Sequence, residues 1–181
     1  MKKVLFILIL VFSIYSFNAQ SIYKGDGNVA FISEAPLEII EGNTDELMGI
    51  VDISNMNFAF KVNIGSFNGF NSALQREHFN EHYLETKKFP DATFLGTMLI
   101  EDDCSSGCVT EAVCKGKFTI HGITQIVIIP VTIDLEENTL KISGEFQVKL
   151  SEYNIKIPKI VQAKIASEVL VKINIVMAKD V

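Results

Sequence analysis

The stretch LKISGEFQVKL, residues 140 to 150, indicates the fold class because its apolar and polar residues alternate strictly. The residues of one parity are Leu140, Ile142, Gly144, Phe146, Val148 and Leu150, and every residue between them is charged or polar. Successive side chains of a strand point to opposite faces. The pattern therefore predicts a β-strand with one buried face and one solvated face.

The same alternation recurs along the chain. It is found in residues 57–64, 114–122, 123–135 and 169–177, and more weakly in residues 29–33 and 94–100. The connections are mostly short and contain Gly, Asn or Asp, as in EENT at residues 136–139. Many strands with such connections predict an all-β protein, built as an antiparallel sandwich or barrel.

One segment, SALQREHFNEHYL at residues 72–84, lacks strand alternation. Ser72 and Gln75 form a capping box, in which the Ser hydroxyl accepts an amide proton and the Gln side chain reaches back to the N-cap amide. Phe79 and Tyr83 are one helical turn apart and should face the sheet. Pro90 prevents a longer helix. We expect one short inserted α-helix near residues 72–85.

The beginning of the chain has the pattern of a secretory signal peptide. Lys2 and Lys3 precede an apolar run at residues 4–14 and a polar stretch at 16–20. The run is too short for a membrane span, and no Cys is present for a lipid anchor. We expect residues 1–20 to be a signal peptide and 21–181 to form one domain of a periplasmic or secreted protein.

Composition argues against a nucleic-acid partner. The formal net charge is −6, and no cluster of Lys and Arg is visible. Binding to phosphate backbones depends on such clusters.

His78, Glu81 and His82 form an H-x-x-E-H pattern, which in one protease group binds zinc. On a helix the two imidazoles would be neighbours and could reach one metal. A catalytic zinc needs a third protein ligand, and no second helix is visible to supply it. A metal-dependent hydrolase is therefore the less favoured hypothesis. We predict no enzyme, no cofactor and no metal site.

Three cysteines leave more than one pairing open. Cys104 and Cys108 flank a hairpin tip, where a disulfide would close a short loop. Pairing of Cys108 with Cys114 is the second possibility. Cys114 shares the parity of Phe118 and Ile120, so it could equally be buried and free.

Two blocks carry a resemblance to the YceI-like family. The first, LQREHFNEHYLETKKFPDATFLG at residues 74–96, resembles its basic-acidic-x-His segment followed by an aromatic-Pro-x-x-x-Phe ending. The matching residues are Arg76, Glu77, His78, Phe79, Phe89, Pro90 and Phe94. The second, GKFTIHGITQIVIIPVTI at 116–133, matches through Gly116, Phe118, Thr119, Ile120, Gly122 and Thr124. The chain is most similar to the short exported members of Bacteroidetes-type bacteria.

The resemblance implies an elongated, lipocalin-like antiparallel barrel of about eight strands, which in this family is associated with an isoprenoid-chain ligand. An eight-stranded barrel has room for packed side chains or for one small ligand. The expected lining residues are Phe58, Phe60, Val62, Phe79, Phe94, Phe118, Ile120, Ile142, Phe146, Val148, Val171 and Ile173. The same residues could instead form a dry packed core.

We therefore expect a non-catalytic binding protein for a long-chain apolar molecule, an isoprenoid or another lipid. The alternative is a stress-related periplasmic interaction module with a dry core and a membrane-protein partner. Arg76 and His78 could contact a polar head group, or they could brace the helix on the barrel rim. The second role is favoured because Arg is often a structural clamp for carbonyl and carboxylate groups.

Overall fold

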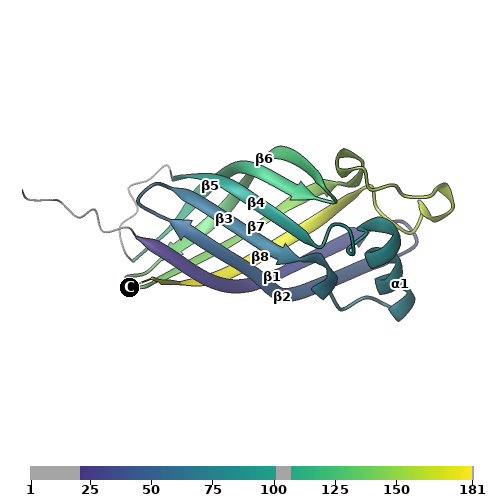
Figure 1. Cartoon of the computed structure of the whole chain (residues 1–181), viewed down its shortest axis with the longest axis horizontal. Coiled ribbons are helices and arrows are strands. Elements are labelled where there is room, and N and C mark those ends of the chain that lie inside the picture. The colour runs from purple at the N-terminus through teal and green to yellow at the C-terminus, as the bar shows by residue number, and fades with distance from the viewer. Residues whose placement is uncertain (1–20, 101–106, 181) are drawn as a thin grey trace, which may run out of the picture.

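A computed structural model describes residues 21–100 and 107–180 of the chain. The predicted signal peptide at residues 1–20 lies outside these residues. The eight strands are β1 (Ile22–Glu34), β2 (Ile39–Asp52), β3 (Asn57–Asn63), β4 (Asp91–Ile100), β5 (Cys108–Ile120), β6 (Ile123–Leu135), β7 (Thr139–Lys149) and β8 (Glu168–Lys179). Each strand pairs antiparallel with the next, and β1 pairs with β8 to close a barrel. The predicted all-β, lipocalin-like antiparallel barrel is confirmed (Figure 1).

The alternating stretch at 140–150 forms β7 and the first residue after it. Leu140, Ile142 and Val148 are buried, as their parity predicts, whereas Glu145 is exposed. Leu150 begins a 3₁₀ turn, η3 (Leu150–Tyr153). The other six segments with strand alternation also lie in strands of the barrel.

The longest strand, β2, has 14 residues and was not predicted. Its buried positions change parity between Thr44 and Leu47. The pairing of β1 with β2 shifts at the same place. Gly27 pairs with Leu47 and Val29 pairs with Thr44, so one residue between the pairs on β1 faces two on β2. This β-bulge adds one residue to β2 and so breaks the alternation.

The connection from β3 to β4 contains η1 (Ile64–Ser66), the predicted helix α1 (Ala73–His78) and a π-helical turn, η2 (Phe79–Tyr83). Ser72 Oγ accepts from the Gln75 amide at 3.2 Å, as predicted. Gln75 Oε1, however, accepts from the amide of Asn71 at 3.1 Å rather than from that of Ser72. Figure 1 shows α1 at one end of the barrel, whereas β8 ends at the other end. Neither α1 nor any other helix in the described part of the chain is long and apolar enough to cross a membrane.

A tight turn at His121 and Gly122 joins β5 to β6, with φ angles of 52° and 73°. Strand parity predicts His121 on the solvated face, but the residue is only 8% exposed. His121 Nδ1 lies 3.0 Å from the Tyr153 carbonyl oxygen, and Nε2 lies 2.8 Å from Glu85 Oε2. The prediction was wrong because a residue in a left-handed turn leaves the alternation of the strand before it.

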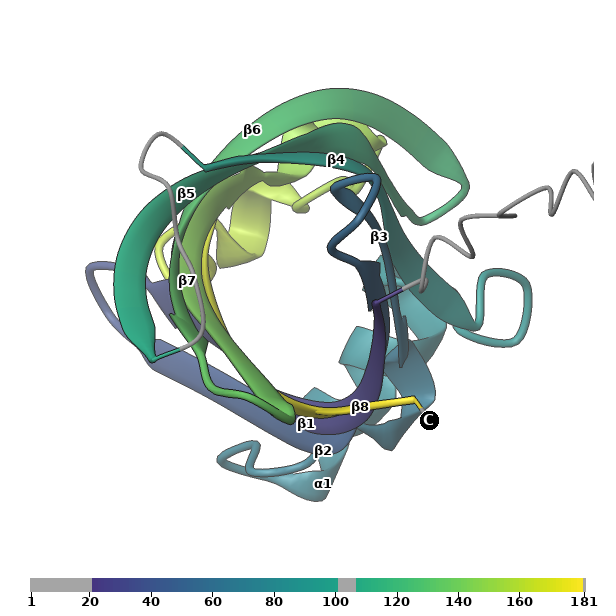
Figure 2. The ribbon, with the colours of Figure 1, turned by 90° about the vertical axis from the view of Figure 1, so that its left-hand side faces the viewer.

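Strands β6 and β7 pair along only part of their length. Val131–Leu135 of β6 pairs with residues 140–144 of β7, and no pair joins the two strands beyond Pro130. Turn η3 occupies the separation, where the Gln125 side chain donates to the Glu152 carbonyl at 3.1 Å. We call this separation the β6–β7 seam. Figure 2 shows β6 arching away from β7.

Candidate functional site

The barrel interior divides into a hollow half and a packed half. The half at the α1 end contains a partly open cavity of about 400 Å³. The other half is filled by side chains that are at most 1% exposed, among them Val51, Met98, Ile133, Leu140 and Met177. The cavity and the packed core expected as alternatives are therefore both present, one in each half.

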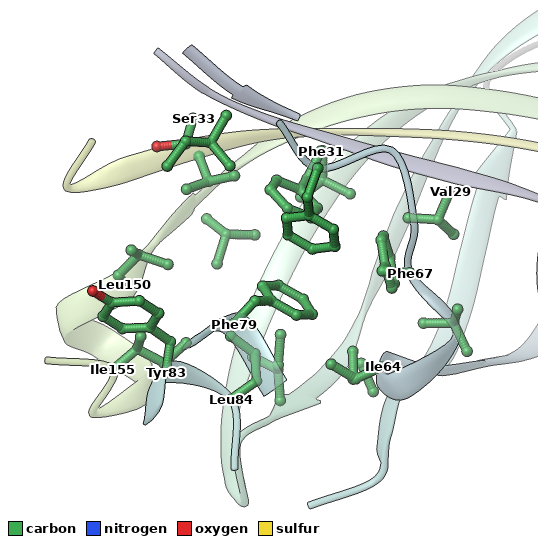
Figure 3. A pocket seen from close by; sticks show the side chains of 18 of the residues that line it. Val29, Phe31, Ser33, Ile64, Phe67, Phe79, Tyr83, Leu84, Leu150 and Ile155 are labelled. Carbon is green, nitrogen blue, oxygen red and sulfur yellow. The ribbon is translucent and has the colours of Figure 1, made fainter. Parts of the chain in front are cut away.

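Aromatic side chains from β1, from η2 and from the loop before α1 line the mouth of the cavity (Figure 3). The Phe79 ring stacks on Phe31 of β1, with ring centroids 5.4 Å apart and planes 5° apart. Phe79 also contacts Phe67 at 5.9 Å and Phe70 at 5.0 Å. Tyr83 lies beside Phe79, and burial raises the pKa of its hydroxyl. The helix therefore turns Phe79 and Tyr83 toward the barrel, as predicted.

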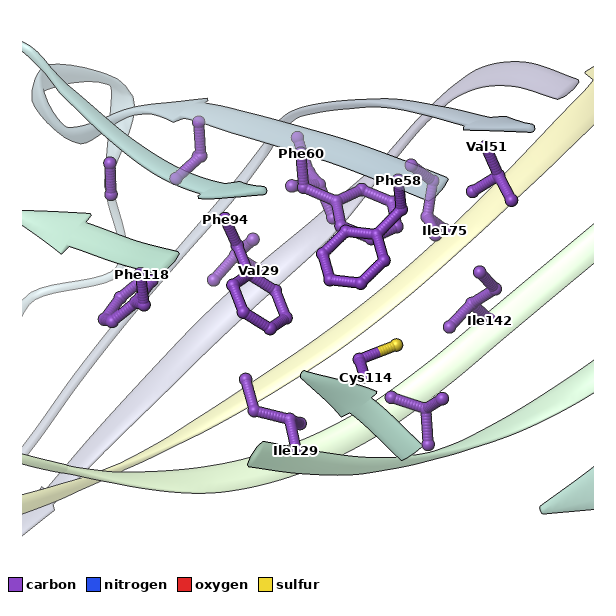
Figure 4. Close-up of a cluster of buried hydrophobic side chains, with 14 of the residues drawn as sticks. Val29, Val51, Phe58, Phe60, Phe94, Cys114, Phe118, Ile129, Ile142 and Ile175 are labelled. Atoms are coloured by element: carbon purple, nitrogen blue, oxygen red, sulfur yellow. The ribbon is translucent and has the colours of Figure 1, made fainter. Parts of the chain in front are cut away.

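The floor of the cavity is also aromatic (Figure 4). Phe60, Phe94 and Phe118 line the cavity and are less than 10% exposed. Phe58 lies behind them, with its ring centroid 4.7 Å from that of Phe94 and 5.4 Å from that of Phe60. A Cβ on Gly49 would lie 2.7 Å from the Phe60 ring, so the glycine leaves room for this ring to lie flat on β2. The floor thus consists of two layers of rings between the cavity and the packed half.

Ten of the twelve predicted lining residues form the cavity wall. They are Phe60, Val62, Phe79, Phe94, Phe118, Ile120, Phe146, Val148, Val171 and Ile173. Phe58 and Ile142 are not part of that wall and pack behind the floor, because they lie farther along their strands toward the filled end.

Other wall residues escaped the prediction. Val29 and Phe31 come from β1, where the alternation is weak, and Leu47 comes from β2, where the bulge hides it. Phe67 and Phe70 come from the loop before α1. Two Phe within the polar loop sequence SFNGFNS were the available signal, since an aromatic ring in such a loop usually has a packing partner.

Polar groups gather at the rim of the cavity. Gln75 Nε2 donates to Glu38 Oε1 at 2.5 Å, and Lys164 Nζ lies 3.7 Å from Glu38 Oε2. Ser33 Oγ, on the wall, accepts from the amide of Ala166 at 2.9 Å. These rim groups have partners within the protein. The deep part of the wall is built mainly of apolar side chains.

The two predicted rim residues differ in placement. His78 contributes to the cavity wall, whereas Arg76 does not. Arg76 Nη2 donates to the Gly65 carbonyl at 3.4 Å, a long hydrogen bond that ties α1 to η1. This geometry is that of a brace rather than of a head-group contact.

The H-x-x-E-H residues do not form a metal centre. The rings of His78 and His82 are 5.3 Å apart. Glu81 accepts from Lys87 Nζ at 2.9 Å, which lowers the pKa of its carboxyl. Within residues 21–100 and 107–180, no three His, Cys, Asp or Glu side chains are grouped so as to hold a metal ion. Among the described residues, the hydrolase hypothesis therefore finds no third ligand for its zinc.

The cysteines are also assigned in part. Cys108 is disulfide-bonded, and Cys114 is a free thiol that is 1% exposed. Pairing of Cys108 with Cys114 is thus excluded. Cys104, the other half of the predicted pair, lies outside the described residues. Burial raises the pKa of Cys114 to about 12.

Fold and cavity together define a class: a lipocalin-like antiparallel barrel with an apolar, aromatic-walled interior site. The family model of the YceI-like domain matches residues 22–177, which is nearly the whole barrel. The chain belongs to the YceI-like family.

Solved structures of the same fold are distant in sequence. A polyisoprenoid binding domain from Saccharophagus degradans, implicated in plant cell wall breakdown, aligns with a TM-score of 0.74 at 11% identity, covering 89% of this chain and 99% of that one. BcnA of Burkholderia cenocepacia aligns with a TM-score of 0.68 at 20% identity, covering 83% of this chain and 95% of that one. The YCEI protein of Campylobacter jejuni aligns with a TM-score of 0.59 at 16% identity, covering 77% of this chain and 84% of that one. No curated protein matches the chain.

Proposed function

We propose that this protein binds one long-chain apolar molecule, an isoprenoid or a similar lipid, in the hollow half of the barrel, without catalysis. The observation that carries the proposal is the cavity of about 400 Å³ with aromatic rings at its mouth and its floor. Ligand sites in proteins commonly measure about 300–1,000 Å³ and are lined by apolar and aromatic side chains. A family relative described as a polyisoprenoid binding domain supports the same class of ligand.

The volume bounds the ligand. At about 30 Å³ for each non-hydrogen atom, the share of one water molecule in the liquid, the cavity holds roughly 13 such atoms. That corresponds to a chain of about three isoprene units. Burial at about 0.8 kcal/mol per carbon gives roughly 10 kcal/mol of gross stabilisation, enough to offset the ordering of a flexible chain.

The polar rim suits a ligand with one polar end. Glu38, Gln75, His78 and Lys164 meet at the mouth, whereas the floor is built of Phe rings. A chain would enter with its apolar end first and leave its polar end near these groups. The leader-like residues 1–20 support binding in the periplasm or outside the cell.

Native mass spectrometry of protein purified from its own host tests the proposal. We expect one bound lipid per chain, released by organic extraction and identified as a single-chain molecule. Delipidated protein should bind farnesol, a three-unit prenol, in a calorimetric titration. A native mass that equals the bare chain, together with no heat of binding for farnesol or for palmitate, would refute the function.

A further inference from the structure

The outer wall formed by β4, β5 and β6 carries an unusual set of side chains. Register places its outward residues in three adjacent rows across the strands. The rows are Leu95–Lys117–Ile126, Thr97–Lys115–Ile128 and Leu99–Val113–Pro130. We call these nine residues the β4–β6 face.

The face is apolar and exposed. Leu95 is 49% exposed, Leu99 59%, Ile126 62% and Ile128 64%. Single exposed apolar residues are ordinary, but a contiguous group of them marks an interaction site. The four side chains and Pro130 surround two exposed lysines.

Charge distinguishes this face from the rest of the protein. The whole chain carries 22 Asp and Glu against 16 Lys and Arg, yet the nine residues include Lys115 and Lys117 and no carboxylate. Of the described carboxylates near it, Asp91 lies 2.9 Å from Lys61, whereas Glu111, in the row next to Val113 and Pro130, accepts from the Thr132 hydroxyl at 3.0 Å and keeps its negative charge. The nine residues of the face therefore carry a net positive charge on an acidic protein.

The opposite wall offers a contrast with the same geometry. There the register builds the row Met48–Asp26–Val176, in which an acidic residue stands where Lys117 stands in the β4–β6 face. Met48 is 51% exposed and Val176 56%. Apolar exposure is thus shared by both walls, but in this row the residue between the apolar side chains is acidic, and in the next row Lys24, between Ile50 and Ala178, is paired with Asp180.

The face ends at the β6–β7 seam. Ile128 and Pro130 border a shallow hollow there, together with Phe146 and Val148. Phe146 and Val148 also form part of the cavity wall. The exposed apolar surface therefore continues to a hollow that shares Phe146 and Val148 with the cavity wall.

We propose that the β4–β6 face rests on the surface of an anionic lipid bilayer. The two ammonium groups would contact lipid phosphates, and the four exposed apolar side chains would enter the layer between head groups and acyl chains. The occupant is argued from charge complementarity. Each lysine near an anionic surface contributes about 1 kcal/mol, so both together correspond to about 30-fold in affinity. The proposal concerns the outer wall and stands without a ligand in the cavity.

Flotation of the protein with vesicles tests it. Vesicles of equal parts phosphatidylglycerol and phosphatidylcholine should bind the protein, and vesicles of phosphatidylcholine alone should bind it at least tenfold more weakly. The double variant Lys115→Gln, Lys117→Gln should lose about 30-fold in binding to the anionic vesicles. The double variant Ile126→Ser, Ile128→Ser should lose at least tenfold. These side chains are exposed, so a thermal unfolding scan should show that all variants fold.

The matched control is Met48→Ser with Val176→Ser on the opposite wall, which should bind anionic vesicles as the unaltered protein does. Equal binding to both kinds of vesicle, or unchanged binding of the lysine variant, would overturn the proposal. So would light scattering that shows a dimer lost in the Ile126→Ser, Ile128→Ser variant, because the face would then be a contact between copies. Delipidated and farnesol-loaded protein should bind vesicles alike, which separates failure of this proposal from failure of the ligand-binding function.

Discussion

Replacing Phe60 by Ala should lengthen the cavity toward the packed half of the barrel. The Phe60 ring lies at the floor, with its centroid 5.4 Å from that of Phe58, and it packs directly on Gly49 of β2. An apolar cavity of about 150 Å³ made by a large-to-small substitution stays dry and accepts a six-carbon ring. Phe60→Ala should therefore admit about one more isoprene unit.

The magnitude follows from the carbons buried. Five carbons at about 0.8 kcal/mol each give a gross gain of about 4 kcal/mol for the fourth isoprene unit. Ordering that unit costs part of this free energy, so we expect an affinity at least tenfold higher for the longer chain. Without ligand, the variant should lose about 3–5 kcal/mol in free energy of unfolding. Phe60→Leu removes much less volume, so it should show a smaller shift in chain preference at a smaller loss of stability.

The assay is calorimetric titration of delipidated protein with farnesol and with the four-unit geranylgeraniol. In the unaltered protein the two dissociation constants should be similar, because the fourth unit stays outside the mouth. In Phe60→Ala the longer prenol should bind at least tenfold more tightly than the shorter. Phe67→Ala is the control, since this ring lies at the mouth and its loss widens the cavity without deepening it. If the dissociation constants of the two prenols stay equal in Phe60→Ala, or differ as much in Phe67→Ala, the Phe60 ring does not limit the length of the bound chain.

Three further predictions concern the rest of the barrel. Cys114→Ala should remove a loss of stability at alkaline pH, because the thiol has a pKa of about 12 in the folded protein and about 9.0 in the unfolded chain. As the pH rises between these two pKa values, the unaltered protein should lose up to about 4 kcal/mol in free energy of unfolding relative to the variant, measured by urea unfolding. His121→Asn keeps a residue that tolerates positive φ but removes the bonds to Glu85 and the Tyr153 carbonyl, and should cost about 1–3 kcal/mol; an unchanged unfolding midpoint would contradict this. Gly116→Ala should cost about 1–3 kcal/mol or prevent folding, because its Cβ would strike the Leu95 carbonyl oxygen on β4; thermal unfolding equal to that of the unaltered protein would refute the close approach.

Much of the fold was predictable because seven of the eight strands bury one face and therefore alternate. β2 was missed because its bulge, between Thr44 and Leu47, shifts the buried set from one parity to the other. No count over a fixed period detects such a strand. His121 was misplaced for a related reason, since alternation ends where φ becomes positive.

The candidate site was predictable in its materials but not in its shape. Parity tells which side chains point inward, and ten of the residues that it named lie on the cavity wall. It cannot tell how far along a strand a residue lies, and so it did not separate Phe60, which faces the cavity, from Phe58, which packs behind it. That distinction depends on strand register and on Gly49, whose missing side chain makes room for the Phe60 ring.

The β6–β7 seam has a mechanical consequence for the barrel. Over the hollow half, the wall is held together at this point by side chains, such as Gln125 on Glu152, and by turn η3, rather than by a ladder of backbone hydrogen bonds. Pro130 has no amide proton and lies next to the last pair, so it sets the end of the ladder. We therefore expect the girth of the hollow half to vary more than that of the packed half, where the ladder between β6 and β7 is continuous. In hydrogen exchange, every second amide of β6 before Pro130 should exchange early, and occupancy of the cavity should alter those rates more than any others in the sheet.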